Sequence, residues 1–127
     1  MKKYIVDTNI FLRFVLKDNK KYYKQAKKYI LLAKKGKISL LLLPQVVFEI
    51  DYVLKNVYLL AKKQRVEILS SLVKSPELKI KERSILIEAV EKYKKLNIDF
   101  VDIYLSQAAK QEKAKILSFD KDFKKLK

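Results

Sequence analysis

The fold is decided by the stretch Lys3-Tyr4-Ile5-Val6-Asp7-Thr8-Asn9, which has the pattern of a buried strand that runs into a helix. The triplet Tyr4-Ile5-Val6 favours the β conformation, so we expect a strand over Lys3 to Asp7. Thr8 is a good helix N-cap, and apolar residues at helical spacing predict a helix from Asn9 to about Lys17. A strand that leads directly into a helix is the first part of a βαβ unit.

The same alternation continues along the rest of the chain. A helix from about Asn19 to Lys35 is expected to end at Gly36, the only glycine, in the left-handed conformation. The aliphatic run Ile38 to Leu43 is typical of a parallel strand covered on both faces. The other expected elements are a helix that begins at Pro44, a helix over Lys62–Val73, a short edge strand at Leu78–Ile80, helices from about Arg83 to Leu96 and from about Asp102 to Lys113, and a strand over Lys115–Phe119. This order predicts an α/β fold, a mostly parallel sheet of 4–5 strands with helices on both faces.

The size and composition indicate one folded domain. With 127 residues, 50% hydrophobic residues, one glycine and two prolines, we expect a single domain over residues 1–127. The longest apolar run, Ile38 to Val47, is much shorter than the roughly 20 residues of a membrane span. Asp7 interrupts the apolar N-terminal stretch before a secretory signal could form. We therefore expect no membrane segment and a cytoplasmic location.

Two residue types that often carry catalysis are missing. The chain has no cysteine, which excludes disulfides, thiolate nucleophiles and thiolate metal sites. It also has no histidine, the usual general base of neutral-pH hydrolases and the usual zinc ligand. Carboxylates and lysines must therefore carry any hydrolytic chemistry.

The chain is strongly basic. It has 30 Lys and Arg against 14 Asp and Glu, a formal net charge of +16. Such a field attracts polyanions, of which nucleic acid is the commonest in a cell. The alternative is that lysine is simply the default surface residue, because lysines are spread along the chain and form no single basic block.

Several acids stand in apolar surroundings, where a carboxylate is more informative than among lysines. Asp7 and Asp120 each follow a predicted parallel strand, at the end where open α/β sheets bind ligands. Asp102 precedes or opens a helix. Each of these three could instead be a turn or helix-cap residue. Glu49 and Asp51 lie on opposite borders of one apolar helical stripe, and periodicity alone does not say which of them faces a site.

Converging carboxylates imply a bound cation, since without one they repel each other and lose their charge. Hard oxygen ligands select Mg²⁺ or Mn²⁺ over zinc. Two such ions about 3.5–4 Å apart can activate water and stabilise the leaving oxygen of a phosphodiester displacement. The basic surface and the embedded acids thus support one mechanism together.

Four motifs in this order resemble the PIN-domain family, and within it toxins of the VapC type. They are Val6-Asp7-Thr8-Asn9, Glu49 in a helix, Phe100-Val101-Asp102-Ile103, and Leu117-Ser118-Phe119-Asp120-Lys121-Asp122-Phe123. Each motif alone is weak, whereas the ordered set across nearly the whole chain is fairly specific. The chain departs from the family pattern at Ile103, where alanine is commoner, and it ends where many relatives continue into a last edge strand.

The resemblance implies a PIN-like three-layer sandwich and assigns roles to named residues. Its metal-binding and catalytic acids would be Asp7, Glu49, Asp102 and Asp120, a choice that favours Glu49 over Asp51. Thr8 or Asn9 would orient Asp7 by a hydrogen bond. Ser118 stands where the family usually has threonine. Asp122 would be an auxiliary acid, with the alternative that Asp-x-Asp here forms only a turn.

The function implied is Mg²⁺- or Mn²⁺-dependent cleavage of RNA by the toxin of a toxin–antitoxin pair. The expected partners are the RNA substrate, a small antitoxin protein and a second copy of the chain, through helices rich in Tyr and Leu near residues 22–60. Two alternatives stay open: a non-catalytic nucleic-acid-binding module with the same fold, and a housekeeping nuclease that processes RNA or acts on DNA.

Overall fold

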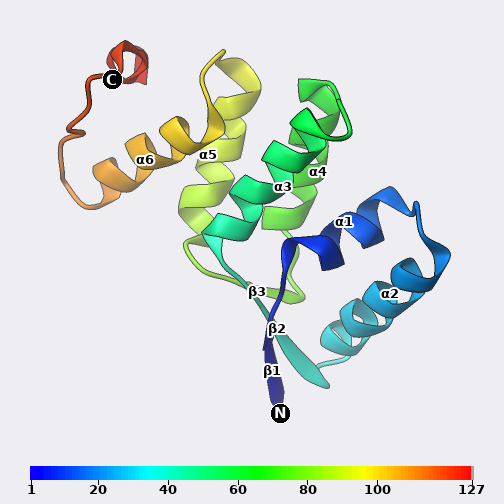
Figure 1. The fold of residues 1–127 in the computed structure, drawn as a ribbon. Helices are drawn as coiled ribbons and strands as arrows, with labels where there is room; N and C mark the ends of the chain where they lie inside the picture. Colours follow the sequence, from blue (N-terminus) through cyan, green and yellow to red (C-terminus); the bar gives the residue numbers. More distant parts are fainter. Residues whose placement is uncertain (127) are drawn as a thin grey trace.

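The computed structural model describes residues 1–126, in which a parallel sheet lies at one end of a larger group of helices (Figure 1). The chain order alternates strands with helices and ends in a short 3-10 helix. The elements are β1 Lys2–Ile5, α1 Thr8–Leu16, α2 Lys20–Lys34, β2 Ile38–Leu42, α3 Pro44–Asn56, α4 Lys62–Val73, β3 Leu78–Ile80, α5 Arg83–Lys95, α6 Phe100–Gln111 and η1 Lys121–Leu126. The expected α/β fold is confirmed.

The sheet has the order β1-β2-β3, and both of its strand pairs are parallel. In its register Ile5 lies beside Leu41, and Leu41 lies beside Lys79. One face is buried through Leu40 and Leu42, and α2 packs against β2. All three strands end at the same edge of the sheet, where β1 leads into α1 and β2 into α3 (Figure 1).

The helices after β2 form a second packed group. Contacts run from α3 to α4, from α4 to α5 and from α5 to α6, and α6 also returns to α3. The ring of Phe48 on α3 meets Phe100 and Tyr104 of α6 edge-on, with centroid separations of 5.7 and 4.8 Å. Phe100 is 1% exposed, so the start of α6 is fixed in the hydrophobic core.

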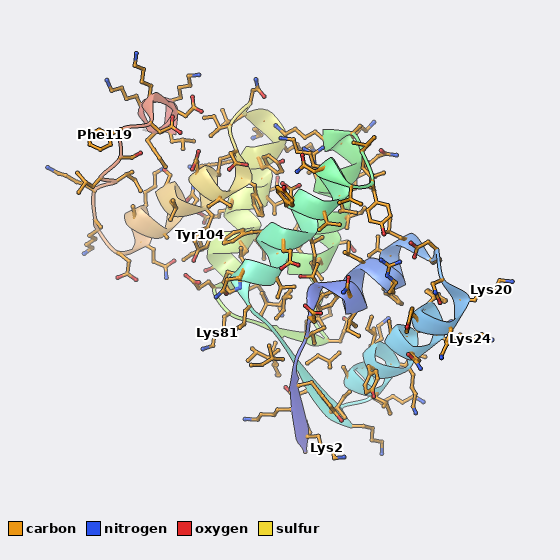
Figure 2. The ribbon with its side chains drawn as sticks, in the orientation of Figure 1. Lys2, Lys20, Lys24, Lys81, Tyr104 and Phe119 are labelled. Carbon is orange, nitrogen blue, oxygen red and sulfur yellow. The ribbon has the colours of Figure 1, made fainter. Side chains whose placement is uncertain are left out.

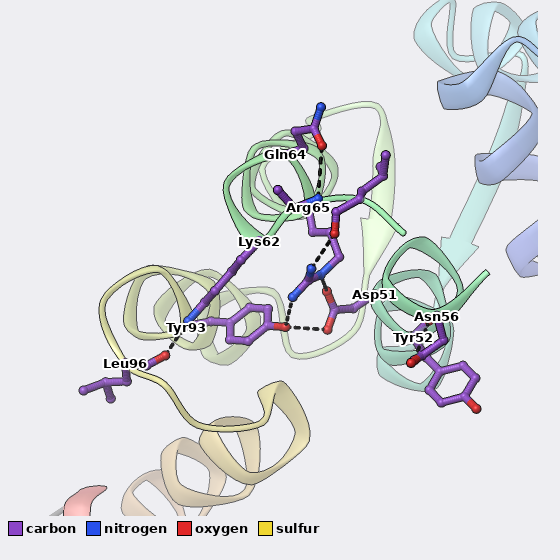
Figure 3. A network of polar contacts seen from close by, with 10 residues as sticks. Asp51, Tyr52, Asn56, Lys62, Gln64, Arg65, Tyr93 and Leu96 are labelled. Atoms are coloured by element: carbon purple, nitrogen blue, oxygen red, sulfur yellow. Dashed lines mark hydrogen bonds and ion pairs between the residues drawn. The ribbon is translucent and has the colours of Figure 1, made fainter. Parts of the chain in front are cut away.

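A buried polar network joins three of these helices (Figure 3). Arg65 Nε on α4 donates to Asp51 Oδ1 on α3 at 3.0 Å, and the Tyr93 hydroxyl on α5 donates to Asp51 Oδ2 at 2.9 Å. Arg65 also donates to the Tyr93 oxygen at 3.0 Å. Both charges of the ion pair are thereby compensated although both side chains are buried. Asp51 therefore faces the buried space between α3, α4 and α5, whereas Glu49 is exposed.

Several expectations about the elements are wrong, and the first concerns burial: the sequence predicts a buried first strand, but all four residues of β1 are exposed. The helix cap is Asp7 rather than Thr8, because Asp7 Oδ1 accepts the Thr8 N–H at 2.8 Å and α1 begins at Thr8. The helix α6 begins at Phe100, two residues before Asp102. Lys115–Phe119 is not a strand but irregular chain, since it pairs with no strand among residues 1–126. The described sheet thus has three strands rather than 4–5.

Gly36 ends the helix α2 as expected, with φ at +72°. Its N–H donates to the Ala33 carbonyl, and the next N–H donates to Leu32. A Cβ at Gly36 would touch nothing within 4 Å, so only the backbone conformation opposes a side chain there. We expect Gly36→Ala to lower the free energy of unfolding by about 1–2 kcal/mol, measured by urea denaturation. Lys35→Ala is the control because Lys35 has φ at −81° and should cost far less.

Candidate metal centre

Three aspartates near the end of the chain form a group that could hold a metal ion. Asp102, Asp120 and Asp122 each offer a carboxylate oxygen, and these three oxygens lie within 4.8 Å of one another. Asp102 comes from the first turn of α6, whereas Asp120 and Asp122 flank the start of η1. The site therefore joins the first turn of α6 to the start of η1, and irregular chain separates the end of α6 from η1.

Local hydrogen bonds shape the loop that carries two of these acids. The Asp120 N–H donates to Ser118 Oγ at 3.0 Å, and the Asp122 N–H donates to Asp120 Oδ1 at 2.9 Å. These are turn-forming bonds between a side chain and the backbone two residues on. Ser118 is thus a positioning residue for Asp120, and Asp122 enters the acidic group as a full member. The sequence predicts Asp122 only as an auxiliary acid, and the Asp-x-Asp spacing does form a turn bond as well.

The three acids interact electrostatically. Partial burial raises the pKa of Asp102, and the negative charges of Asp99, Asp120 and Asp122 raise it further. Asp102 therefore resists ionisation in the absence of a cation. A hard divalent cation would relieve this repulsion, and oxygen-only ligands in a chain without His or Cys suit Mg²⁺ or Mn²⁺. The donor set fits such an ion.

This repulsion gives the metal-free protein a testable pH dependence. Because the pKa of folded Asp102 lies above its ordinary value of 3.8, the folded state holds the proton more tightly than the unfolded state. The contribution of Asp102 to the free energy of unfolding is complete at pH values below its ordinary pKa of 3.8. It is lost as the pH rises through the raised pKa of the folded state. We expect Asp102→Asn to lack this loss, so that its stability relative to the wild type increases from acidic to neutral pH. Urea unfolding in EDTA across this range measures the difference.

Asp7 and Glu49 are not brought into this group. Among residues 1–126, neither Asp7 nor Glu49 belongs to a group of three or more acids whose carboxylate oxygens lie within 4.8 Å of one another. Asp7 lies at the end of β1, where it caps α1, and Glu49 is exposed on α3. Thr8 is 2% exposed, and its hydroxyl has no hydrogen-bond partner among the described residues. Asn9 is exposed. Among the described residues, neither the Thr8 nor the Asn9 side chain makes the expected hydrogen bond to Asp7.

Three lysines line a hollow beside one acid of this group, Asp120. Asp120 lines a hollow of about 530 Å³ that is also lined by Lys110, Lys115 and Lys124. The neighbouring Lys110 lowers the pKa of Lys92, burial lowers it further, and the negative charge of Glu88 partly offsets both effects. Figure 2 shows lysine side chains extending from many parts of the surface. An anion such as a phosphate would relieve the repulsion between Lys92 and Lys110.

Comparison with known proteins identifies the family. Residues 4–127 match the PIN domain. The chain belongs to the PIN-domain family. No curated protein and no solved structure matches it significantly. PIN domains are generally nucleases, and they typically use divalent metal ions, which agrees with the acidic group found here. None of the described helices is long and apolar enough to span a membrane.

Proposed function

We propose that this PIN domain is a Mg²⁺- or Mn²⁺-dependent endoribonuclease. The observation that carries the proposal is the convergence of Asp102, Asp120 and Asp122 in a protein with a net charge of +16. Asp120 also forms a turn, but the mutual repulsion of the three carboxylates opposes their convergence when no cation is bound. A cation site beside lysines explains why they are kept together.

Different residues of the chain would bind the ion and the substrate. Asp102, Asp120 and Asp122 would hold the divalent ion through carboxylate oxygens. An ion held there would supply the activation of a water and the stabilisation of the leaving oxygen in phosphodiester hydrolysis. Lys110, Lys115 and Lys124, which line the hollow of Asp120, would bind substrate phosphates. Asp7 and Glu49 are proposed as further acids of the same site.

Titration with Mn²⁺ tests the metal site. Binding to the folded state alone stabilises it by about 2.7 kcal/mol when the ion is at 100 times its Kd. We expect a rise in the thermal midpoint of the wild type with Mn²⁺ concentration and a much smaller rise for Asp120→Asn. Asp18→Asn is the matched control, because among residues 1–126 this exposed acid pairs with Arg13 and Tyr58 alone and should leave the response intact. An unchanged midpoint in the wild type would contradict the proposal.

A non-catalytic nucleic-acid-binding module is the second candidate, favoured by the position of Asp7 and Glu49 outside the acidic group. Matched RNA and DNA strands, each incubated with Mn²⁺ and with EDTA, separate the two. Cleavage of RNA that EDTA abolishes supports the enzyme, preferential cleavage of DNA supports a DNA-directed nuclease, and binding without cleavage supports the module.

The toxin role is a finer proposal that rests on the resemblance to VapC-type proteins. It predicts a small antitoxin protein that binds this chain and inhibits cleavage, and growth arrest on expression that a metal-ligand variant does not cause. A bacterial growth assay with the wild type and Asp120→Asn tests this. Equal growth of the two cultures, with both proteins expressed, would count against a toxin.

A further inference from the structure

Helix α2 carries a large share of the positive charge of the protein. Residues 19–48 contain no Asp or Glu but eight lysines, which are Lys20, Lys21, Lys24, Lys27, Lys28, Lys34, Lys35 and Lys37. Six of them belong to α2, whereas α4 and α5 mix Lys and Arg with Glu. Lysines that were only default surface residues would be mixed with acids here as well, because opposite charges three or four residues apart stabilise a helix.

The lysines of α2 lie on its solvent face. The side that packs on β2 and α1 consists of small and aliphatic residues, which are Ala26, Ile30 and Ala33. Helical spacing places Lys21, Lys24 and Lys28 on the opposite side, and all three are exposed. Figure 2 shows Lys20 and Lys24 extending from α2 away from the body of the protein. A row of ammonium groups therefore follows the outer side of a helix that is about 22 Å long.

This row of lysines opposes the stability of the helix. Lys20 and Lys21 stand in the first turn, where the helix dipole favours carboxylates, and that turn has no acid. Lys24 lies four residues from both Lys20 and Lys28, a spacing at which like charges repel. Among residues 1–126, the ion pairs include none with a lysine of α2. A bound polyanion would remove this repulsion.

Two tyrosines flank the lysines. Tyr22 and Tyr29 are seven residues apart, so helical geometry places them in one line along α2, beside the face that carries Lys21 and Lys28. Tyr22 is 51% exposed and Tyr29 is 38% exposed. Lysines that bind phosphates, beside exposed aromatic rings on which bases stack, are the combination that binds single-stranded nucleic acid without reading its sequence.

This face is separate from the candidate metal centre. The helix α2 packs against α1 and β2, whereas α6, which carries Asp102, packs against α5, α3 and η1. Figure 1 shows α2 and the region of α6 and η1 on opposite sides of the protein. A nucleic acid that contacts both α2 and the acidic group must therefore extend across the molecule.

An RNA strand fits this face better than a membrane or a second copy of the chain. An anionic membrane takes up an amphipathic helix through its apolar face, and that face of α2 is buried on β2 and α1. A second copy of the same face would bring like charges together. The phosphates of RNA complement the lysines, and its unpaired bases suit the tyrosines.

We propose that the outer face of α2, formed by Lys21, Lys24 and Lys28 with Tyr22 and Tyr29, is a docking surface for single-stranded RNA outside the cleavage site. The choice of RNA rests on the proposed function. A substrate long enough to reach α2 is held there while another part of it lies at the acidic group. Docking then raises the affinity for long substrates, because the second contact is intramolecular, and leaves the cleavage step unchanged.

RNA binding in EDTA tests the docking surface without cleavage. The variant Lys21→Gln/Lys24→Gln/Lys28→Gln removes three charges and keeps residues that favour helices. Fluorescence anisotropy with a long, unstructured labelled RNA is expected to give a Kd about 10- to 100-fold higher than that of the wild type at about 0.1 M salt. The slope of log K against log salt should be smaller by about 2, because each phosphate contact to a single strand contributes about 0.7.

The control variant removes the same charge from other helices. Lys63→Gln/Lys94→Gln/Lys95→Gln changes three exposed lysines of α4 and α5. A Kd of the α2 variant no higher than that of this control overturns the proposal. Vesicles that contain phosphatidylserine provide the second arm. If the α2 variant loses vesicle binding while it binds RNA as the control does, the face is a membrane surface and the proposal is wrong.

Cleavage kinetics separate this inference from the proposed function. With Mn²⁺, the α2 variant is expected to show a raised KM for long RNA and an unchanged kcat, because only binding away from the reacting atoms is lost. An unchanged KM together with a raised Kd would show that RNA on α2 is not the RNA that is cut, and would overturn the docking of substrate. Absence of cleavage by the wild type would refute the proposed function, and the anisotropy comparison in EDTA would still decide whether α2 binds RNA.

Discussion

Asp7→Asn is expected to lower metal-dependent RNA cleavage by about 100-fold or more. Loss of even an outer partner of a metal ligand commonly costs about 10- to 100-fold in activity, so loss of a proposed ligand charge should cost at least as much. The fold should be retained. Asparagine keeps the Oδ1 acceptor with which Asp7 caps the Thr8 N–H, and it is an equally good N-cap.

The measurement is the initial rate of RNA cleavage at saturating Mn²⁺, with unfolding by urea as the check on folding. Asp18→Asn makes the same change of charge close to the far end of α1 and should cleave at nearly the wild-type rate, because a surface ion pair contributes little. Undiminished cleavage by pure Asp7→Asn would remove Asp7 from the site. It would leave the group of Asp102, Asp120 and Asp122 as the only candidate centre among residues 1–126.

Glu49 and Asp51 show what sequence periodicity settles and what it leaves open. Both lie beside the apolar stripe of α3, and a helical wheel ranks them equally. The resemblance to PIN domains favoured Glu49. The structure supplies an independent reason, because Asp51 is occupied by Arg65 and Tyr93 while Glu49 faces solvent. Nothing in a lysine-rich sequence distinguishes Arg65 as the buried partner, since its pairing is between different helices.

The elements predicted correctly are those with local signals. Gly36 ends α2 and Pro44 begins α3, each as expected. The segment Lys115–Phe119 was predicted as a strand from its composition, but a strand also needs a partner edge. That requirement is not local, and this segment pairs with no strand among residues 1–126. Without that pairing, Asp120 does not follow a strand beside β1, and Asp7 is not part of its acidic group.

Arg65→Met should have the largest effect on stability, a loss of about 3–5 kcal/mol in the free energy of unfolding. Methionine fills much of the space of the arginine stem, but the Asp51 carboxylate would stay buried with its counter-charge removed. The Tyr93 hydroxyl alone would still donate to it. Urea denaturation at neutral pH measures the loss.

A triple variant separates the free-energy cost of a buried unpaired charge from the net contribution of the network to stability. Replacing the group together, as Asp51→Leu, Arg65→Met and Tyr93→Phe, leaves no buried charge without a partner, and it should recover most of the stability lost in the single variant. The Leu60 carbonyl, which accepts from Arg65 at 2.8 Å, is the one acceptor left to solvent. If the triple variant were as unstable as Arg65→Met, the network would be stabilising in its own right. The network would then hold α3, and Glu49 on it, in place through a net favourable contribution to stability. The loss in Arg65→Met would then not come from the unpaired Asp51 charge alone.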